Sequence, residues 1–119
     1  MTSAGTNIEQ RSIILIPFPY TDLSGAKKRP ALVISSSDFN QKNEDVVCCL
    51  ITSNLEGKQH AIIIDNKDME TGLLEFESKV KHYRIFTVNK KLVYRVLGKL
   101  NLLKSKLVIE EINKIIYIK

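Results

Sequence analysis

The residues best suited to chemistry lie at the end of a basic loop. Lys27, Lys28 and Arg29 precede Pro30 at the entrance of an apolar run. Pro30 restricts Arg29 to an extended backbone and so fixes the direction of its side chain. A guanidinium stays charged and presents a planar fork of donors that suits a phosphate. Arg29 is therefore a candidate phosphate-binding residue, although a solvated basic loop is the commoner meaning of such a run.

A second group of polar side chains follows another apolar run. Residues 46–51 are succeeded by Thr52, Ser53 and Asn54, three small side chains that form hydrogen bonds. Such a cluster usually caps a turn. Beside a fixed guanidinium, the same side chains could also hold a phosphate and the negative charge that it develops during transfer.

Other arrangements for catalysis are missing from the sequence. It contains no GxxxxGK[ST], GxGxxG or HExxH pattern, which argues against nucleotide binding and zinc-protease chemistry. His60 and His82 lack ligand spacing, and Cys48 and Cys49 supply at most two thiolates. Neighbours on a strand point to opposite faces, so these two cysteines are expected to be buried free thiols. We therefore expect no protein-built metal site and no cofactor.

The positive charge is concentrated in the second half of the chain. The net charge is +5, and residues 79–106 contain nine Lys and Arg but no Asp or Glu. Tyr83, Phe86 and Tyr94 lie among these bases. Such a field attracts polyanions, and the aromatic rings could stack on nucleobases. A solvated face and an acidic protein partner are the alternatives.

Short apolar runs separated by turn residues must position these groups. They predict strands near residues 13–16, 31–35, 46–52, 61–64, 80–88 and 92–98, with a loop over 18–29. Only residues 107–118 have a helical spacing, with Ser105 as the expected cap. We therefore predict a mainly β domain with one C-terminal helix, either a small closed barrel or two orthogonally packed sheets.

The sequence also predicts a simple domain organisation. Residues 1–10 are expected to form a disordered tail and residues 11–119 a single domain. The chain contains neither an apolar run of about 18 residues nor the apolar core of a signal peptide. A cytoplasmic protein without membrane association is expected.

Two stretches carry a resemblance to a known family. IILIPFPYTDLS at residues 13–24 and KRPALVIS at residues 28–35 resemble the N-terminal signature of the MazF/PemK-like toxins. The similarity continues through residues 50–53 and, more weakly, through 72–73, 78–80, 85–88 and 96–100, in the family's order. Two positions depart from the family pattern: Arg11-Ser12 replaces Gly-Asp, and Glu77 replaces a proline.

The resemblance implies an SH3-like barrel of the CcdB/PemK type that forms a homodimer and cuts single-stranded RNA. It also implies a cognate acidic antitoxin as partner. Arg29 and Thr52 correspond to the family's catalytic pair. Residues expected to contact RNA are Tyr20, Thr21, Lys27, Lys28, Ser53, Asn54, His60 and Ser78.

The expected reaction needs no metal, because the 2′-hydroxyl of the substrate attacks the adjacent phosphorus. It leaves 2′,3′-cyclic phosphate and 5′-hydroxyl ends. His60 is considered as the general base, with an ordinary surface histidine as the alternative. A protein that binds nucleic acid without cutting it, or a CcdB-like gyrase poison, is the competing class.

Overall fold

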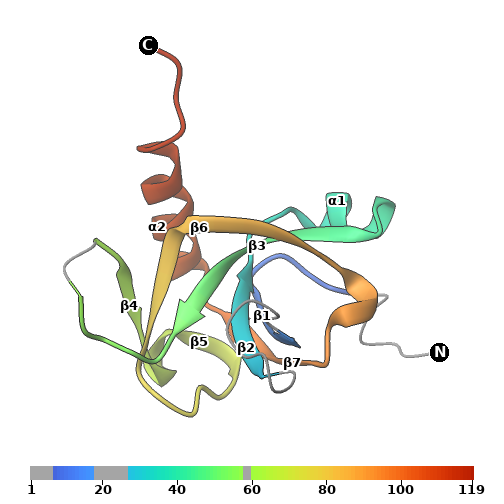
Figure 1. Ribbon diagram of the computed structural model, residues 1–119, viewed down its shortest axis with the longest axis horizontal. Coiled ribbons are helices and arrows are strands. Elements are labelled where there is room, and N and C mark those ends of the chain that lie inside the picture. The colour runs from blue at the N-terminus through green and yellow to red at the C-terminus, as the bar shows by residue number, and fades with distance from the viewer. Residues whose placement is uncertain (1–6, 18–26, 58–59) are drawn as a thin grey trace.

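One curled antiparallel sheet dominates the computed structural model, which describes residues 7–17, 27–57 and 60–119 (Figure 1). Its seven strands follow the order β4-β6-β3-β2-β1-β7-β5 and form a half-barrel. The strands are β1 (Ser12–Pro17), β2 (Lys28–Val33), β3 (Asp45–Thr52), β4 (Ile62–Ile64), β5 (Met69–Gly72), β6 (Ser78–Asn89) and β7 (Arg95–Leu100). The helices are α1 (Ser37–Lys42), α2 (Leu102–Asn113) and the single-turn 3-10 helices η2 (Asn66–Asp68) and η3 (Lys90–Leu92).

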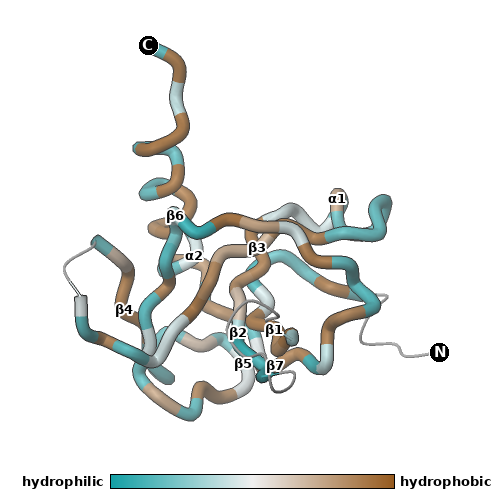
Figure 2. Tube along the Cα trace, viewed as in Figure 1, coloured by the Kyte–Doolittle hydropathy of each residue, from teal (hydrophilic) through white to brown (hydrophobic). Residues whose placement is uncertain are grey.

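Both faces of the central strands are buried. Ile13, Leu32 and Cys49 pack with Val108 and Ile112 of α2 in a first core cluster. A second cluster on the opposite face contains the residues that alternate with them: Ile14, Ile16, Ala31, Val33, Val46 and Cys48. Side chains that alternate along a strand point to opposite faces, which explains the continuous apolar runs of the sequence. Figure 2 shows the resulting apolar stretch along β3.

The two cysteines behave as the sequence predicts. Cys48 and Cys49 are free, buried, and assigned to different core clusters. Burial raises the pKa of each thiol to about 12, so both remain protonated near neutral pH.

The predicted fold class, mainly β with a C-terminal helix, is confirmed, but several element boundaries differ. The helix α1 and the strand β5 were not predicted. The C-terminal helix runs from Leu102 to Asn113. It begins at Leu102 because Asn101 is its N-cap, whose side chain accepts a hydrogen bond from Lys104 N at 2.8 Å. Ser105, the cap expected from the sequence, is buried inside the helix.

The folded part of the chain begins nearer the N-terminus than the sequence predicts. Of the predicted tail, residues 1–6 lie outside the described part of the chain. Ile8 is only 3% exposed, and Asn40 Nδ2 donates to its carbonyl oxygen at 3.0 Å. Gln10 Nε2 donates to Ile34 O at 2.8 Å, so residues 8–10 belong to the folded body.

Within the described ranges, no helix is long and apolar enough to cross a membrane.

Candidate RNA-cleavage site

The sheet register places Arg29 and Thr52 on one face. Arg29 lies in β2 rather than in the preceding loop, where the sequence had placed it. The strands β2 and β3 pair through Val33–Cys48, Leu32–Cys49 and Ala31–Leu50. The pairing ends at Ala31–Leu50, and continuing the same register by two positions would bring Arg29 opposite Thr52. Since alternate residues share a face, both side chains point to the side of Ala31 and Leu50, away from α2.

Arg29 has an unsatisfied donor. Its side chain is half-buried, and its Nε is buried with no hydrogen-bond partner among the described residues. Burying a polar group without a hydrogen bond costs free energy, and a charged group costs more. An anion that accepts hydrogen bonds from this guanidinium would remove the cost.

The Thr52 hydroxyl caps a turn and can still donate a hydrogen bond of its own. Its Oγ1 accepts a hydrogen bond from Asn54 N at 3.1 Å. Asn54 Oδ1 in turn accepts from Glu56 N at 3.0 Å. A hydroxyl that accepts one hydrogen bond can still donate its own proton. Ser53 and Asn54 are exposed beside it.

The other predicted RNA contacts divide into two groups. Lys27 and Lys28 are exposed, and Lys28 Nζ lies 4.4 Å from the centre of the Tyr94 ring. Ser78 is buried, and its Oγ donates to Phe76 O at 2.9 Å, so this hydroxyl proton is used internally. Tyr20 and Thr21 lie outside the described residues.

His60 lies against α2 instead of beside Thr52. Its Nε2 is 2.9 Å from Glu111 Oε1, and its ring centre is 5.5 Å from that of His82. Ile62, two residues after His60, pairs with Val80, which belongs to the core cluster under α2. The structure therefore brings together two histidines that the sequence treats as unrelated, on the side of the sheet away from Arg29.

A cleft opens on the face that carries Arg29 and Thr52. It has a volume of about 430 Å³ and is lined by Ile16, Pro17, Leu50, residues 83–89 and Leu92. Ile16 is the β1 partner of Arg29, and Leu50 precedes Thr52 by two residues. Tyr83, Arg84 and Phe86 contribute aromatic and basic groups along one wall. Sequence reasoning did not assign these three to the site, although the mixture of bases and aromatics in residues 79–106 is their signal.

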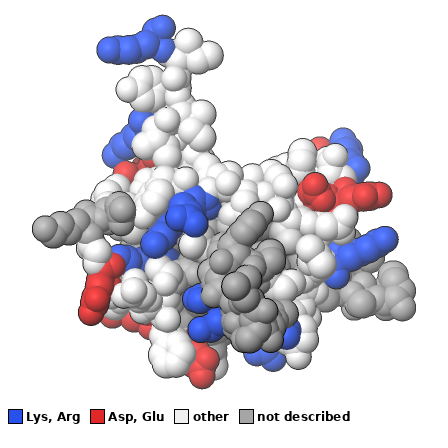
Figure 3. Space-filling model, viewed as in Figure 1, with Lys and Arg blue, Asp and Glu red and all other residues white. Residues whose placement is uncertain are grey.

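Positive charge is spread over one face of the molecule. In Figure 3, Lys and Arg atoms lie near the middle of the visible face and at its outline, whereas Asp and Glu atoms lie toward the outline. Such a distribution attracts an anionic strand toward the centre of the face.

Known proteins identify the family. Residues 9–116 match the family of PemK-like, MazF-like toxins of type II toxin–antitoxin systems. The chain belongs to this family. No curated protein matches the sequence.

Solved structures of MazF toxins share the fold. The MazE–MazF complex (Form-III) of Deinococcus radiodurans gives a TM-score of 0.73 at 16% identity, covering 92% of this chain and 95% of that chain. The Mycobacterium tuberculosis toxin MazF-mt6 gives 0.69 at 19% identity, covering 87% and 94%. An endoribonuclease from a mycobacterial species gives 0.61 at 20% identity, covering 90% and 85%. The resemblance noted in the sequence is thereby confirmed.

The structure explains how this MazF-like toxin accommodates Arg11 in place of the usual glycine. Arg11 has a φ of 77°, in the left-handed region that favours glycine. Its Nη1 donates to Glu70 Oε1 and to Leu100 O, both at 2.9 Å. These two contacts tie the turn before β1 to β5 and β7 and offset the backbone cost of an arginine at this position.

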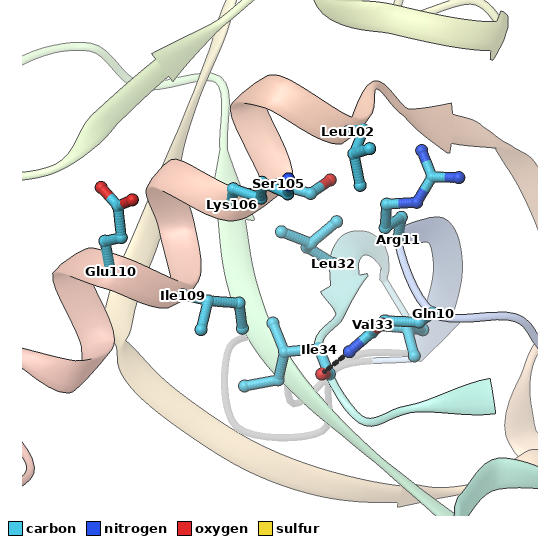
Figure 4. Close-up of a pocket in the computed structure, with 10 residues that line it drawn as sticks. All are labelled: Gln10, Arg11, Leu32, Val33, Ile34, Leu102, Ser105, Lys106, Ile109 and Glu110. Atoms are coloured by element: carbon cyan, nitrogen blue, oxygen red, sulfur yellow. Dashed lines mark hydrogen bonds between the residues drawn. The ribbon is translucent and has the colours of Figure 1, made fainter. Parts of the chain in front are cut away.

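A second hollow of the toxin lies on the other face. It has a volume of about 280 Å³ and lies between β2 and α2, where Leu32, Ile34, Leu102 and Ile109 form apolar walls (Figure 4). None of the described residues that the sequence assigns to the site lines it. It shares no lining residue with the cleft formed by Ile16, Leu50 and residues 83–89, so the two hollows are separate.

Metal ligation has no evident centre in the described ranges. Residues 7–17, 27–57 and 60–119 contain no group of three or more His, Cys, Asp or Glu side chains placed to hold a metal ion.

The buried histidine should make the toxin acid-sensitive. Burial lowers the pKa of His82 from its ordinary value of 6.5, nearby His60 lowers it further, and Glu111 opposes both effects. The unfolded chain therefore binds a proton at a higher pH than the native state, and stability should fall as the pH drops below about 6.5. Urea unfolding from pH 8 to 5 should show this loss, and His82→Leu should flatten it.

The matched control for that experiment is His60→Gln, which retains the buried ring and should retain most of the acid loss, because burial is the larger cause of the lowered pKa of His82. Native stability that rises on acidification through this range would contradict the assignment to His82.

Proposed function

We propose that this toxin is an endoribonuclease that cuts single-stranded RNA, including mRNA, with Arg29 and Thr52 holding the scissile phosphate. The observation that carries the proposal is the shared face of these two residues beside a basic and aromatic cleft. The unsatisfied Nε of Arg29 suits an anionic ligand. The toxin family supports the same activity, and two fold neighbours are named endoribonucleases.

The reaction follows from what these side chains can do. The substrate's 2′-oxygen forms a bond to phosphorus as the bond to the 5′-oxygen breaks. Arg29 binds the non-bridging oxygens, where negative charge grows in the transition state. Thr52 donates its hydroxyl hydrogen bond to the same phosphate and so aligns it for attack. The 2′-hydroxyl gives up its proton to water, and the departing 5′-oxygen takes a proton from water, which leaves 2′,3′-cyclic phosphate and 5′-hydroxyl ends.

Cleavage should persist in an excess of chelator, since the substrate supplies the nucleophile and Arg29 meets the developing charge. The test incubates the purified toxin with single-stranded RNA and maps both ends of every product. Activity lost in chelator, or 3′-hydroxyl and 5′-phosphate ends, would refute this chemistry. An RNA pool that stays bound but uncut would favour the competing class, a nucleic-acid-binding or CcdB-like toxin without RNase activity.

A cognate acidic antitoxin is the partner that fits the positive face. Three of the D. radiodurans fold neighbours are MazE–MazF complexes, and opposite charge favours the encounter of such partners. The proposed binding surface is the face that carries Arg29, so antitoxin and RNA would compete for it.

A homodimer is the proposed assembly. Large apolar side chains remain exposed on α2 and on the segment that follows it: Leu102, Leu103, Leu107, Ile109, Ile115, Ile116, Tyr117 and Ile118. Figure 1 shows this segment projecting from the body, and Figure 2 shows its apolar character. An apolar surface of this kind commonly marks a protein interface. We place the toxin in the cytoplasm, where its proposed substrate and antitoxin occur.

A further inference from the structure

The row of side chains that contains Arg29 and Thr52 continues onto β6. Lys79 is the β6 partner of Thr52, and the same residue pairs with Ile63 of β4. Directly opposed residues of neighbouring strands share a face and lie about 5 Å apart. Arg29, Thr52 and Lys79 therefore occupy three successive strands at one level of the sheet.

The environment of Lys79 is unusual for a lysine. It is only 6% exposed, and its Nζ donates to Glu56 O at 2.8 Å. No carboxylate of the described residues lies within ion-pair distance of it. A fully buried lysine normally has a charged partner. Two partly buried lysines of this chain follow that rule, since Lys99 contacts Glu9 and Lys104 Nζ lies 3.7 Å from Asp68 Oδ1.

The structural role of the hydrogen bond to Glu56 O does not by itself explain why a lysine occupies this buried position. The contact with Glu56 O secures the segment that follows Thr52, but any neutral donor could make it. The ammonium has three protons, and this contact uses one of them. A buried charge that faces only a neutral carbonyl is costly, so an arriving anion would stabilise it.

We propose that Lys79 binds a phosphate of the RNA strand that passes over Arg29 and Thr52. This inference rests on the proposed function and extends it by a further binding residue. Glu56 is exposed, so the ammonium lies just beneath the loop at the edge of the site. The strand would run across the sheet from β2 toward β6, with Arg29 at one end of the row and Lys79 at the other.

The salt dependence of RNA binding separates a phosphate contact from a brace. Lys79→Gln keeps a donor for Glu56 O and removes the charge. Each phosphate contact with a single strand contributes about 0.7 to the slope of log K against log salt. The slope should therefore be shallower by about 0.7 in Lys79→Gln, and the affinity ratio of native toxin to variant should shrink about threefold between 50 and 200 mM KCl.

The probe is a labelled random-sequence RNA with 2′-O-methyl groups, which cannot be cut through its 2′-oxygen. Affinities are measured by fluorescence anisotropy in chelator, and cleavage of the unmodified pool is followed in parallel. Lys79→Arg retains the charge and should retain the slope. The matched control is Lys90→Gln, because Lys90 Nζ donates to Asn40 O at 2.7 Å at the other end of β6. This control should leave the slope unchanged.

Every outcome of the salt experiment either supports or overturns the contact of Lys79 with a phosphate. A native slope in Lys79→Gln, with a native toxin that binds and cuts RNA, would overturn the inference and leave the proposed function intact. A native toxin that neither binds nor cuts RNA would overturn both. If Lys79→Gln loses its circular dichroism, the nitrogen-15 resonance of Lys79 Nζ in the native toxin decides. A shift on adding the probe, with Lys90 Nζ unmoved, supports the contact, and no shift overturns it.

Discussion

Arg29→Ala should cut RNA about 10²- to 10³-fold more slowly than the native toxin while keeping its fold. Removing one preorganised group that stabilises transition-state charge costs roughly 3 to 4 kcal/mol. The fold should survive because Arg29 Nε makes no hydrogen bond to any described residue. Single-turnover cleavage of a limiting RNA substrate measures the rate, and thermal unfolding by circular dichroism measures the fold.

Two further variants make this experiment specific: a conservative replacement of Arg29, and the removal of an arginine on the opposite face. Arg29→Lys should also be slow, because an ammonium is a point charge without the planar fork of donors. Arg95→Ala removes the same charge from the opposite face, since Arg95 pairs with Leu15 whereas Arg29 pairs with Ile16. It should cut at nearly the native rate, and induced expression should still arrest growth. If Arg29→Ala cuts normally, the proposed phosphate site is wrong.

The sequence predicts the strands that carry this site because their causes are local. Pro30 restricts Arg29 to an extended backbone, and continuous apolar runs indicate strands that are buried on both faces. The position of Lys79 could not be predicted in this way. It depends on the register of β3 with β6, which shifts between Cys49 and Leu50. A one-residue slip in that register would turn Lys79 to the other face of the sheet.

Elements that depend on distant contacts were missed for the same reason. Residues 69–72 contain no β-branched run, and β5 exists because Gly72 meets Gly98 of β7. A Cβ atom on Gly98 would lie 2.3 Å from Thr71 O, so only glycine permits this approach of the two backbones. The His60, His82 and Glu111 cluster likewise joins a loop, a strand and a helix that are remote in sequence.

RNA affinity of the native toxin should fall about 50-fold between 50 and 200 mM salt. Four cations of β2 and β6 lie on the face of Arg29 or beside the cleft: Arg29, Lys79, Lys81 and Arg84. Four phosphate contacts with a single strand give a slope of about −2.8, because each bound phosphate releases condensed counterions. Anisotropy with the 2′-O-methyl RNA pool measures this slope. Binding that ignores salt over this range would argue against a phosphate-lined path.

An acidic antitoxin segment should displace the RNA, since both polyanions neutralise the same cations. With RNA and antitoxin in direct competition, the apparent Kd for RNA rises in proportion to antitoxin concentration without reaching a plateau. Separate sites would instead give a plateau and a ternary complex in sedimentation, which would contradict the shared surface. A scrambled segment of equal charge is the control, because it retains the electrostatic attraction but loses the side-chain fit. If the scrambled segment displaces RNA equally well, charge alone accounts for the competition. If the native segment is much stronger, specific contacts on the Arg29 face add to the electrostatic attraction.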